Sequence, residues 1–97
     1  MNLTPKDKRK LKSLAHHLKP VIQVGQKGIT DSILSAIDKT LQDHELIKIK
    51  FVDFKEDRRN ITIKIAETTK SELITIIGNT SILFRQNTDP EKRKITY

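Results

Sequence analysis

The four residues Gly25-Gln26-Lys27-Gly28 are the most distinctive chemical feature of this 97-residue sequence. Two glycines at this spacing, between a β-branched run and a helix start, can leave backbone N–H groups unpaired near the positive end of a helix dipole. A phosphate can dock there without meeting a Cβ, and Lys27 adds a mobile cation. Plain tight turns have the same spacing, so the loop alone permits either an anion site or a structural turn.

Positive charge is concentrated around this loop. The chain carries a net charge of +7, and residues 1–28 hold seven Lys or Arg side chains against Asp7 alone, a local charge of +6. A one-sided field of this kind attracts a polyanion, and its lysines would contact phosphates without reading sequence. Charge runs also serve simply to solvate a helix face. Together with the glycine loop, however, the run favours phosphate contact over a structural turn.

The sequence lacks the residues that several kinds of catalytic and metal sites require. The absence of cysteine removes disulfides, thiolate metal sites and cysteine nucleophiles. His16, His17 and His44 have no carboxylate pair to complete a site, so we expect structural or surface roles for them. The motifs G-x-G-x-x-G, G-x-x-x-x-G-K-[ST] and G-x-S-x-G are missing. We expect a protein that is not an enzyme, with no catalytic residue, metal site, cofactor or small-molecule substrate.

The elements that position the loop follow from periodicity. Residues 4–7, Thr-Pro-Lys-Asp, are typical of a capped helix start, and an amphipathic helix with a basic exterior should end at Pro20. Residues 21–24 predict a short buried strand, and residues 30–43 a helix capped by Thr-Asp-Ser. Alternation over residues 46–52 predicts a strand with lysines on one face. The loop therefore lies between a strand and a helix.

The second half of the chain is harder to interpret. Residues 56–70 fit a strand or a helix, and periodicity does not decide between them. Two apolar runs, 73–77 and 82–85, join across Gly78-Asn79-Thr80 and predict a hairpin. Residues 95–97 could add an edge segment. Arg85 is expected to be an ordinary surface arginine by default, and near the glycine loop if the strands are neighbours.

The composition suits one domain over residues 1–97, because 35% hydrophobic residues support a single thin core. The polar, cationic start lacks the pattern of a secretion signal or spanning helix, so a cytoplasmic protein without membrane association is expected. Phe51, Phe54, Phe84 and Tyr97 are few aromatics for stacking bases, and Phe51 and Phe84 are expected in the core. Backbone and shape recognition are therefore favoured over stacking.

The segments, in order, resemble a CRM domain, the chloroplast RNA splicing and ribosome maturation family, and in particular its stand-alone bacterial YhbY-like members. The His-Glu-Leu-Ile-Lys run after a G-x-x-G loop is the most specific part of this resemblance. Phe84 stands where the family often has tyrosine. The matching segments are Leu14-Ala15-His16, Lys19-Pro20-Val21, Gly25 to Thr30, His44 to Lys50, Ile76-Ile77-Gly78 and Leu83-Phe84-Arg85.

The resemblance implies an α/β fold of α+β type with two to three layers, in the order α-β-α-β-α-β-β. Its mixed four-stranded sheet with packed helices is similar to the C-terminal domain of translation initiation factor 3, and residues 56–70 become a helix. The resemblance also implies association with ribosomal RNA in precursors of the large ribosomal subunit, by a protein expected to be monomeric. The expected RNA-binding residues are Gly25, Gln26, Lys27, Gly28, Thr30, Lys6, Lys8, Arg9, Lys10, Lys12 and Arg85.

A second hypothesis assigns the basic helix to protein contacts. In this alternative the chain is an interaction module that docks on ribosomal proteins or another acidic partner. Both hypotheses predict sensitivity to salt, because both depend on exposed charges. They differ in whether association with ribosomal particles survives digestion of the accessible RNA.

Overall fold

Helices and strands follow one another in the predicted order. The computed structural model describes residues 2–97. A 3₁₀ turn at Lys55–Asp57 (η1) precedes the third helix, and another at Pro90–Lys92 (η2) follows the last strand. The main elements are α1 (Pro5–Ala15), β1 (Ile22–Val24), α2 (Asp31–His44), β2 (Leu46–Phe51), α3 (Arg58–Thr69), β3 (Glu72–Ile77) and β4 (Thr80–Phe84).

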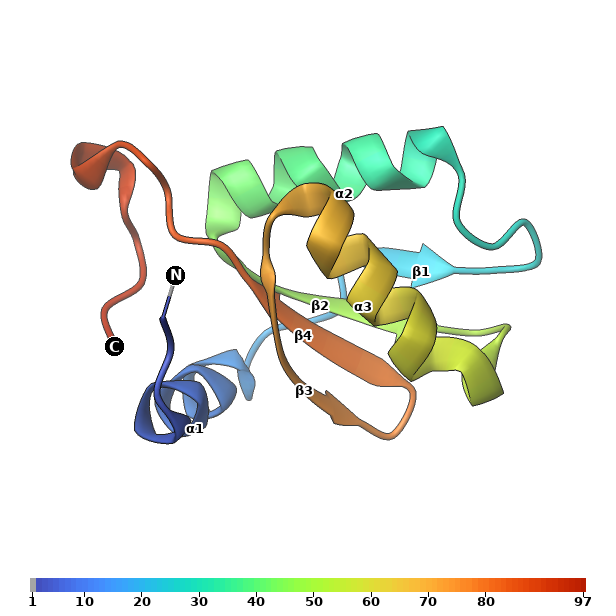
Figure 1. Cartoon of the computed structure of the whole chain (residues 1–97), viewed down its shortest axis with the longest axis horizontal. Helices are drawn as coiled ribbons and strands as arrows, with labels where there is room; N and C mark the ends of the chain where they lie inside the picture. The colour runs from blue at the N-terminus through green and yellow to red at the C-terminus, as the bar shows by residue number, and fades with distance from the viewer. Residues whose placement is uncertain (1) are drawn as a thin grey trace.

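The four strands form one mixed sheet in the order β1-β2-β4-β3. Strand β1 is parallel to β2, whereas β4 is antiparallel to both β2 and β3. Helices α2 and α3 lie over one face, and α1 lies against part of the other face (Figure 1). The predicted α-β-α-β-α-β-β order and mixed four-stranded sheet are therefore confirmed.

Strand β2 supplies side chains to both faces of the sheet. Ile47, Ile49 and Phe51 are buried in the larger core under α2 and α3. Leu46 belongs to a smaller core with Leu11 of α1 and with the hairpin strands. Because side chains alternate along a strand, the predicted lysines of β2 share the face that α1 covers only in part.

Residues 58–69 form a helix, which settles the segment that periodicity left open. Helix α3 buries Thr62, Ile65 and Ala66 against the sheet, whereas Ile63 stays exposed. The Thr62 hydroxyl lies 2.8 Å from the Ser81 hydroxyl of β4 in a buried hydrogen bond. Burial at every third or fourth residue is the helical pattern, so the strand alternative was wrong.

Two boundaries differ from the prediction. Helix α1 ends at Ala15, well before Pro20, and its capping box is formed as expected by Thr4 and Asp7. The C-terminal residues 95–97 add no strand. Instead, Ile95 packs on the smaller core, and the Tyr97 ring meets Phe84 edge-on with centroids 5.3 Å apart.

The segment after β4 is held by the buried carboxylate of Glu45, the residue just before β2. Glu45 is 1% exposed, and its carboxylate accepts N–H groups from Asn87 at 2.6 Å, Lys94 at 2.6 Å and Ile95 at 3.0 Å. Its carbonyl also accepts the Arg85 N–H. Three backbone donors satisfy a charge that would be costly to bury alone, so Glu45 anchors the C-terminal segment.

We expect Glu45→Ala to destabilise the fold by roughly 3 kcal/mol, because one buried and two partly buried N–H groups lose a charged acceptor. Alanine keeps the positive φ of 65° at this position, so the variant isolates the carboxylate from the backbone strain. Urea unfolding measures the change, with Glu67→Ala on the exposed face of α3 as the control. Equal stability of the two variants would contradict the anchoring role.

Candidate nucleic-acid interface

The predicted glycine loop is a tight turn closed by its own hydrogen bond. The Gly28 N–H donates to the Gly25 carbonyl at 2.9 Å. Gly28 has a φ of +64°, in the left-handed region, and a Cβ there would lie 3.4 Å from Cε2 of Phe54. Gln26 and Lys27 at the tip are exposed, whereas Gly28 is buried. The two glycines thus differ, since Gly25 would meet only Val52 Cγ2 at 3.8 Å.

Two N–H groups near this turn are engaged within the protein. Gly28 already donates within the turn, and the Ile33 N–H donates to the Thr30 hydroxyl at 3.1 Å. Thr30 therefore caps α2, as its residue type predicted. Two of the backbone donors near the turn are therefore used within the protein, and the expected contact of this loop with a phosphate stays a prediction. The side chains of Gln26 and Lys27 are what the turn presents to a ligand.

Three loops meet at the same end of the sheet. The Val52 N–H donates to the Val24 carbonyl at 3.0 Å, and the Phe51 N–H donates to the Asn79 carbonyl at 2.7 Å. These bonds bring together the glycine turn, the segment after β2 and the hairpin turn (Figure 1). The C-terminal segment lies at the opposite end.

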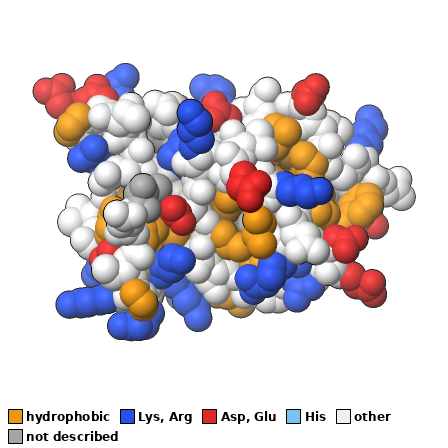
Figure 2. Space-filling view, in the orientation of Figure 1, with side chains coloured by type: hydrophobic (Ala, Val, Ile, Leu, Met, Phe, Trp, Pro, Cys, Tyr) orange, Lys and Arg blue, Asp and Glu red, His pale blue; other side chains and the backbone are white. Residues whose placement is uncertain are grey.

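Helix α1 carries most of the predicted cationic residues on its outer surface. Figure 2 shows Lys and Arg side chains gathered over this helix at the lower left. Asp7, the one acidic residue of the first 28, is engaged as the cap, where its Oδ2 accepts the Thr4 N–H at 3.0 Å. Of the five predicted cations, Lys8 is half-buried, and the exposed ones are Lys6, Arg9, Lys10 and Lys12.

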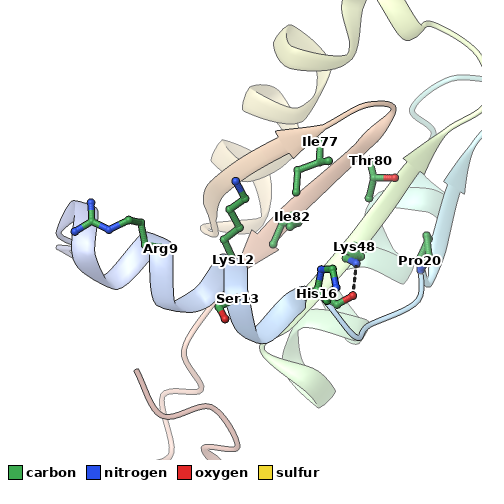
Figure 3. Close-up of a pocket in the computed structure, with 9 residues that line it drawn as sticks. All are labelled: Arg9, Lys12, Ser13, His16, Pro20, Lys48, Ile77, Thr80 and Ile82. Carbon is green, nitrogen blue, oxygen red and sulfur yellow. Dashed lines mark hydrogen bonds between the residues drawn. The ribbon is translucent and has the colours of Figure 1, made fainter.

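A groove of about 660 Å³ lies between α1 and the β3-β4 hairpin (Figure 3). Its rim is cationic, and none of its lining residues is acidic. Lys48 of β2 lies beside the end of α1, where its Nζ donates to the Leu18 carbonyl at 3.0 Å and the His16 carbonyl at 3.4 Å. The lining residues are Arg9, Lys12, Ser13, His16, Pro20, Lys48, Ile77, Thr80 and Ile82.

Arg85 is not near the glycine turn, which corrects the predicted position. It follows β4, whose last residue Phe84 pairs with Leu46 at the start of β2. Its Nη1 lies 2.6 Å from Asp38 Oδ1 and also donates to the Thr69 carbonyl at 2.8 Å. The guanidinium therefore joins α2, α3 and β4. The antiparallel pairing of β4 with β2 places it at the far end of the sheet.

The cationic cluster 92–94 also lies at this far end, since the Lys94 N–H is bound to Glu45. The histidines form no metal site: among residues 2–97, no three His, Cys, Asp or Glu side chains are grouped to hold a metal ion. His16 instead lines the groove. In the same part of the chain, no helix has both the length and the apolar character needed to cross a membrane.

Sequence reasoning missed two residues with structural roles, one beside the groove and one at the opposite end of the sheet. Lys48 and Glu45 were part of the most specific motif, yet neither was assigned a structural role. The alternation of β2 placed Lys48 on the open face, but the helix end that it meets is 30 residues away. No local pattern indicates that Glu45 is buried, because its partners lie 42 to 50 residues later.

Comparison with known proteins assigns the family. A model of the CRS1/YhbY (CRM) domain matches residues 3–85. The chain belongs to this family. It is 38% identical over 93 residues to a Pseudomonas aeruginosa protein named "Probable RNA-binding protein", covering 95% of this chain and 89% of that one.

Two further relatives agree with this assignment. A Bacillus subtilis protein, also named "Probable RNA-binding protein", is 37% identical over 86 residues, which cover 88% of this chain and 90% of that one. The solution structure of a hypothetical Staphylococcus aureus protein matches with a TM-score of 0.80 and 33% identity, covering 98% of this chain and all of the other. The CRM domain resemblance and its fold are therefore confirmed.

We expect Gly28→Ala to destabilise the protein by about 1–2 kcal/mol, because alanine at a left-handed φ is strained and its Cβ crowds the Phe54 ring. Gly25→Ala is the matched control and should have little effect, since its Cβ has room. Urea unfolding of both variants measures the difference. Equal losses would show that the two glycines are structurally equivalent, against the geometry of the turn.

Proposed function

We propose that this protein binds structured ribosomal RNA during assembly of the large ribosomal subunit, through α1 and the glycine turn. The observation that carries the proposal is the cationic surface of α1, whose nearest acidic residue is engaged as a helix cap. The names of the Pseudomonas and Bacillus relatives support RNA as the ligand. Assembly of the large subunit is what the family resemblance implies, and we adopt it as part of the proposal.

We assign the proposed roles in RNA binding by the exposure of each side chain. Lys6, Arg9, Lys10 and Lys12 attract and anchor phosphates, and Gln26 and Lys27 contact the backbone from the tip of the turn. Gly25, Gly28 and Thr30 act indirectly, because they shape the turn and cap α2. We leave Arg85 out of the surface, since its guanidinium is paired with Asp38. In this proposal the protein acts by binding in the cytoplasm, as a monomer and without turnover.

The double variant Gln26→Asp/Lys27→Asp should weaken binding to a ribosomal RNA fragment by about tenfold or more, because it turns the tip of the turn acidic. The slope of log affinity against log salt should also fall by about one for each lost phosphate contact. A control with the same change in charge, Thr88→Asp/Lys92→Asp, lies at the far end of the sheet in the exposed C-terminal segment. Unchanged affinity in the folded Gln26/Lys27 variant would remove the turn from the binding surface.

The rival hypothesis, docking on ribosomal proteins, has one observation in its favour. Leu14, Leu18 and Val21 are exposed side by side along a second hollow, which Lys19 and Lys94 also line. Such an apolar patch with a cationic border suits a protein partner. Protein docking would use this patch together with the charges of α1.

Ribonuclease treatment separates the two hypotheses. If RNA is the partner, digestion of accessible RNA should release the protein from ribosomal particles, measured by sedimentation and immunodetection. Leu18→Asp provides the matched control, because it alters the apolar patch and should leave co-sedimentation unchanged. Retention after digestion, together with loss of co-sedimentation in Leu18→Asp, would assign the contact to a protein instead.

A further inference from the structure

We propose that the groove between α1 and the β3-β4 hairpin holds an unpaired segment of the bound RNA, which runs there from the glycine turn across the open face of the sheet. This inference rests on the proposed function and specifies the form of RNA recognised. It concerns the residues of β2, β3 and β4 that line the groove, none of which was among the predicted RNA contacts.

One wall of the groove is a single stripe of α1. Arg9, Lys12, Ser13 and His16 are spaced by three and four residues, so their Cβ atoms lie on one side of the helix. The stripe offers two permanent cations, a hydroxyl and an imidazole. These groups suit the sugar-phosphate backbone of a strand that lies along the helix.

The floor of the groove is apolar, and its accessible part is Ile77. Ile77, at the end of β3, is 51% exposed, whereas its neighbour Ile82 of β4 is 1% exposed and belongs to the smaller core (Figure 3). Pro20 also lines the groove. A nucleobase has an apolar face that can cover such side chains. In a paired stem the bases are stacked inside, and only their edges and the backbone are offered to a protein. An apolar floor below a cationic wall therefore favours an unpaired nucleotide.

A row of side chains links the groove to the glycine turn. Gln23 of β1, Lys50 of β2, Thr80 of β4 and Ile77 of β3 are partners in the strand register, so they share one face of the sheet. Three strand spacings carry this row across about 14 Å. Gln23 lies two residues before Gly25, and Lys50 provides an exposed cation midway. Gln23 and Thr80 add groups that can hydrogen-bond base edges.

Lys48 holds a positive charge in a fixed position beside the groove. Its Nζ is held by the Leu18 and His16 carbonyls, so the ammonium is fixed beside the groove before any ligand arrives. A preorganised charge loses little side-chain freedom on binding. An acidic peptide would also be attracted to this charge. The continuous row to the glycine turn favours RNA, because a strand that contacts the turn would reach the groove without a second partner.

Two RNAs and one pair of isoleucines test the inference. The probes are a hairpin RNA with a fully paired stem and the same hairpin with a bulge of several unpaired nucleotides. Ile77→Glu places a carboxylate on the groove floor, and Ile63→Glu is its control on α3, where the isoleucine is 41% exposed on the opposite side of the sheet. We expect tighter binding of the bulged RNA by the wild type, and loss of that preference in Ile77→Glu alone.

A second pair of variants guards against misfolding of Ile77→Glu. Lys12→Ala removes a cation from the groove, and Lys64→Ala removes an exposed lysine from α3. Lys12→Ala should weaken the bulged RNA several-fold more than Lys64→Ala does. If Ile77→Glu and Lys12→Ala keep the full preference while Gln26→Asp/Lys27→Asp loses affinity, the groove is excluded and RNA binding stands.

Three other results would overturn the inference in distinguishable ways. Equal binding of paired and bulged RNA by the wild type would mean that unpaired nucleotides are not recognised, whereas the proposed function would stand. Binding of neither RNA would contradict the proposed function as well. Competition by an acidic peptide that is abolished by Ile77→Glu, with RNA affinity unchanged in that variant, would assign the groove to a protein segment.

Discussion

The fold depends on β2, one of the two central strands, which is hydrogen-bonded on both edges and packed on both faces. It pairs with β1 on one side and β4 on the other, and its isoleucines and Phe51 fill the core beneath α2 and α3. Because side chains alternate, the same register that buries Ile47 and Ile49 turns Lys48 and Lys50 to the opposite face. A slip of one residue would exchange the two sets and bury the lysines. The larger core and the cationic sheet face therefore share one origin.

Features that depend on neighbouring residues could be predicted from the sequence. Helix α3 could not be predicted in this way, because its position depends on distant contacts. The caps at Thr4 and Thr30 and the alternation of β2 are local patterns, and each formed as expected. Ile61, Ile63 and Ile65 fit a strand as well as a helix, because the pattern does not say which isoleucine is buried. The contact of Thr62 with Ser81, 19 residues away, is part of what fixes the helix in place. Only the family resemblance indicated this helix from the sequence.

In the candidate site, too, local features were predictable and long-range contacts were not. Composition located the cationic segment, and spacing located the glycine turn, since both are properties of contiguous residues. The pairing of Arg85 with Asp38 spans 47 residues and depends on how β4 returns along β2. The internal hydrogen bond of the turn likewise depends on the backbone of Gly28, which is folded beneath Phe54. Sequence reasoning thus found the charges but could not tell which donors were already engaged.

The contact of Lys48 with the carbonyls after α1 is structural, and it also shapes the binding surface. In a continuing helix the His16 carbonyl would accept an N–H from residue 20, but that residue is proline and has no N–H. Lys48 supplies a donor to this carbonyl, and a second one to that of Leu18. The ammonium also lies where the negative end of the helix dipole favours a cation. This contact, just after the end of α1, therefore joins the helix to β2 and fixes a positive charge beside the groove. Charge at this position is built into the fold, whereas the outer lysines of α1 remain free to adapt to a ligand.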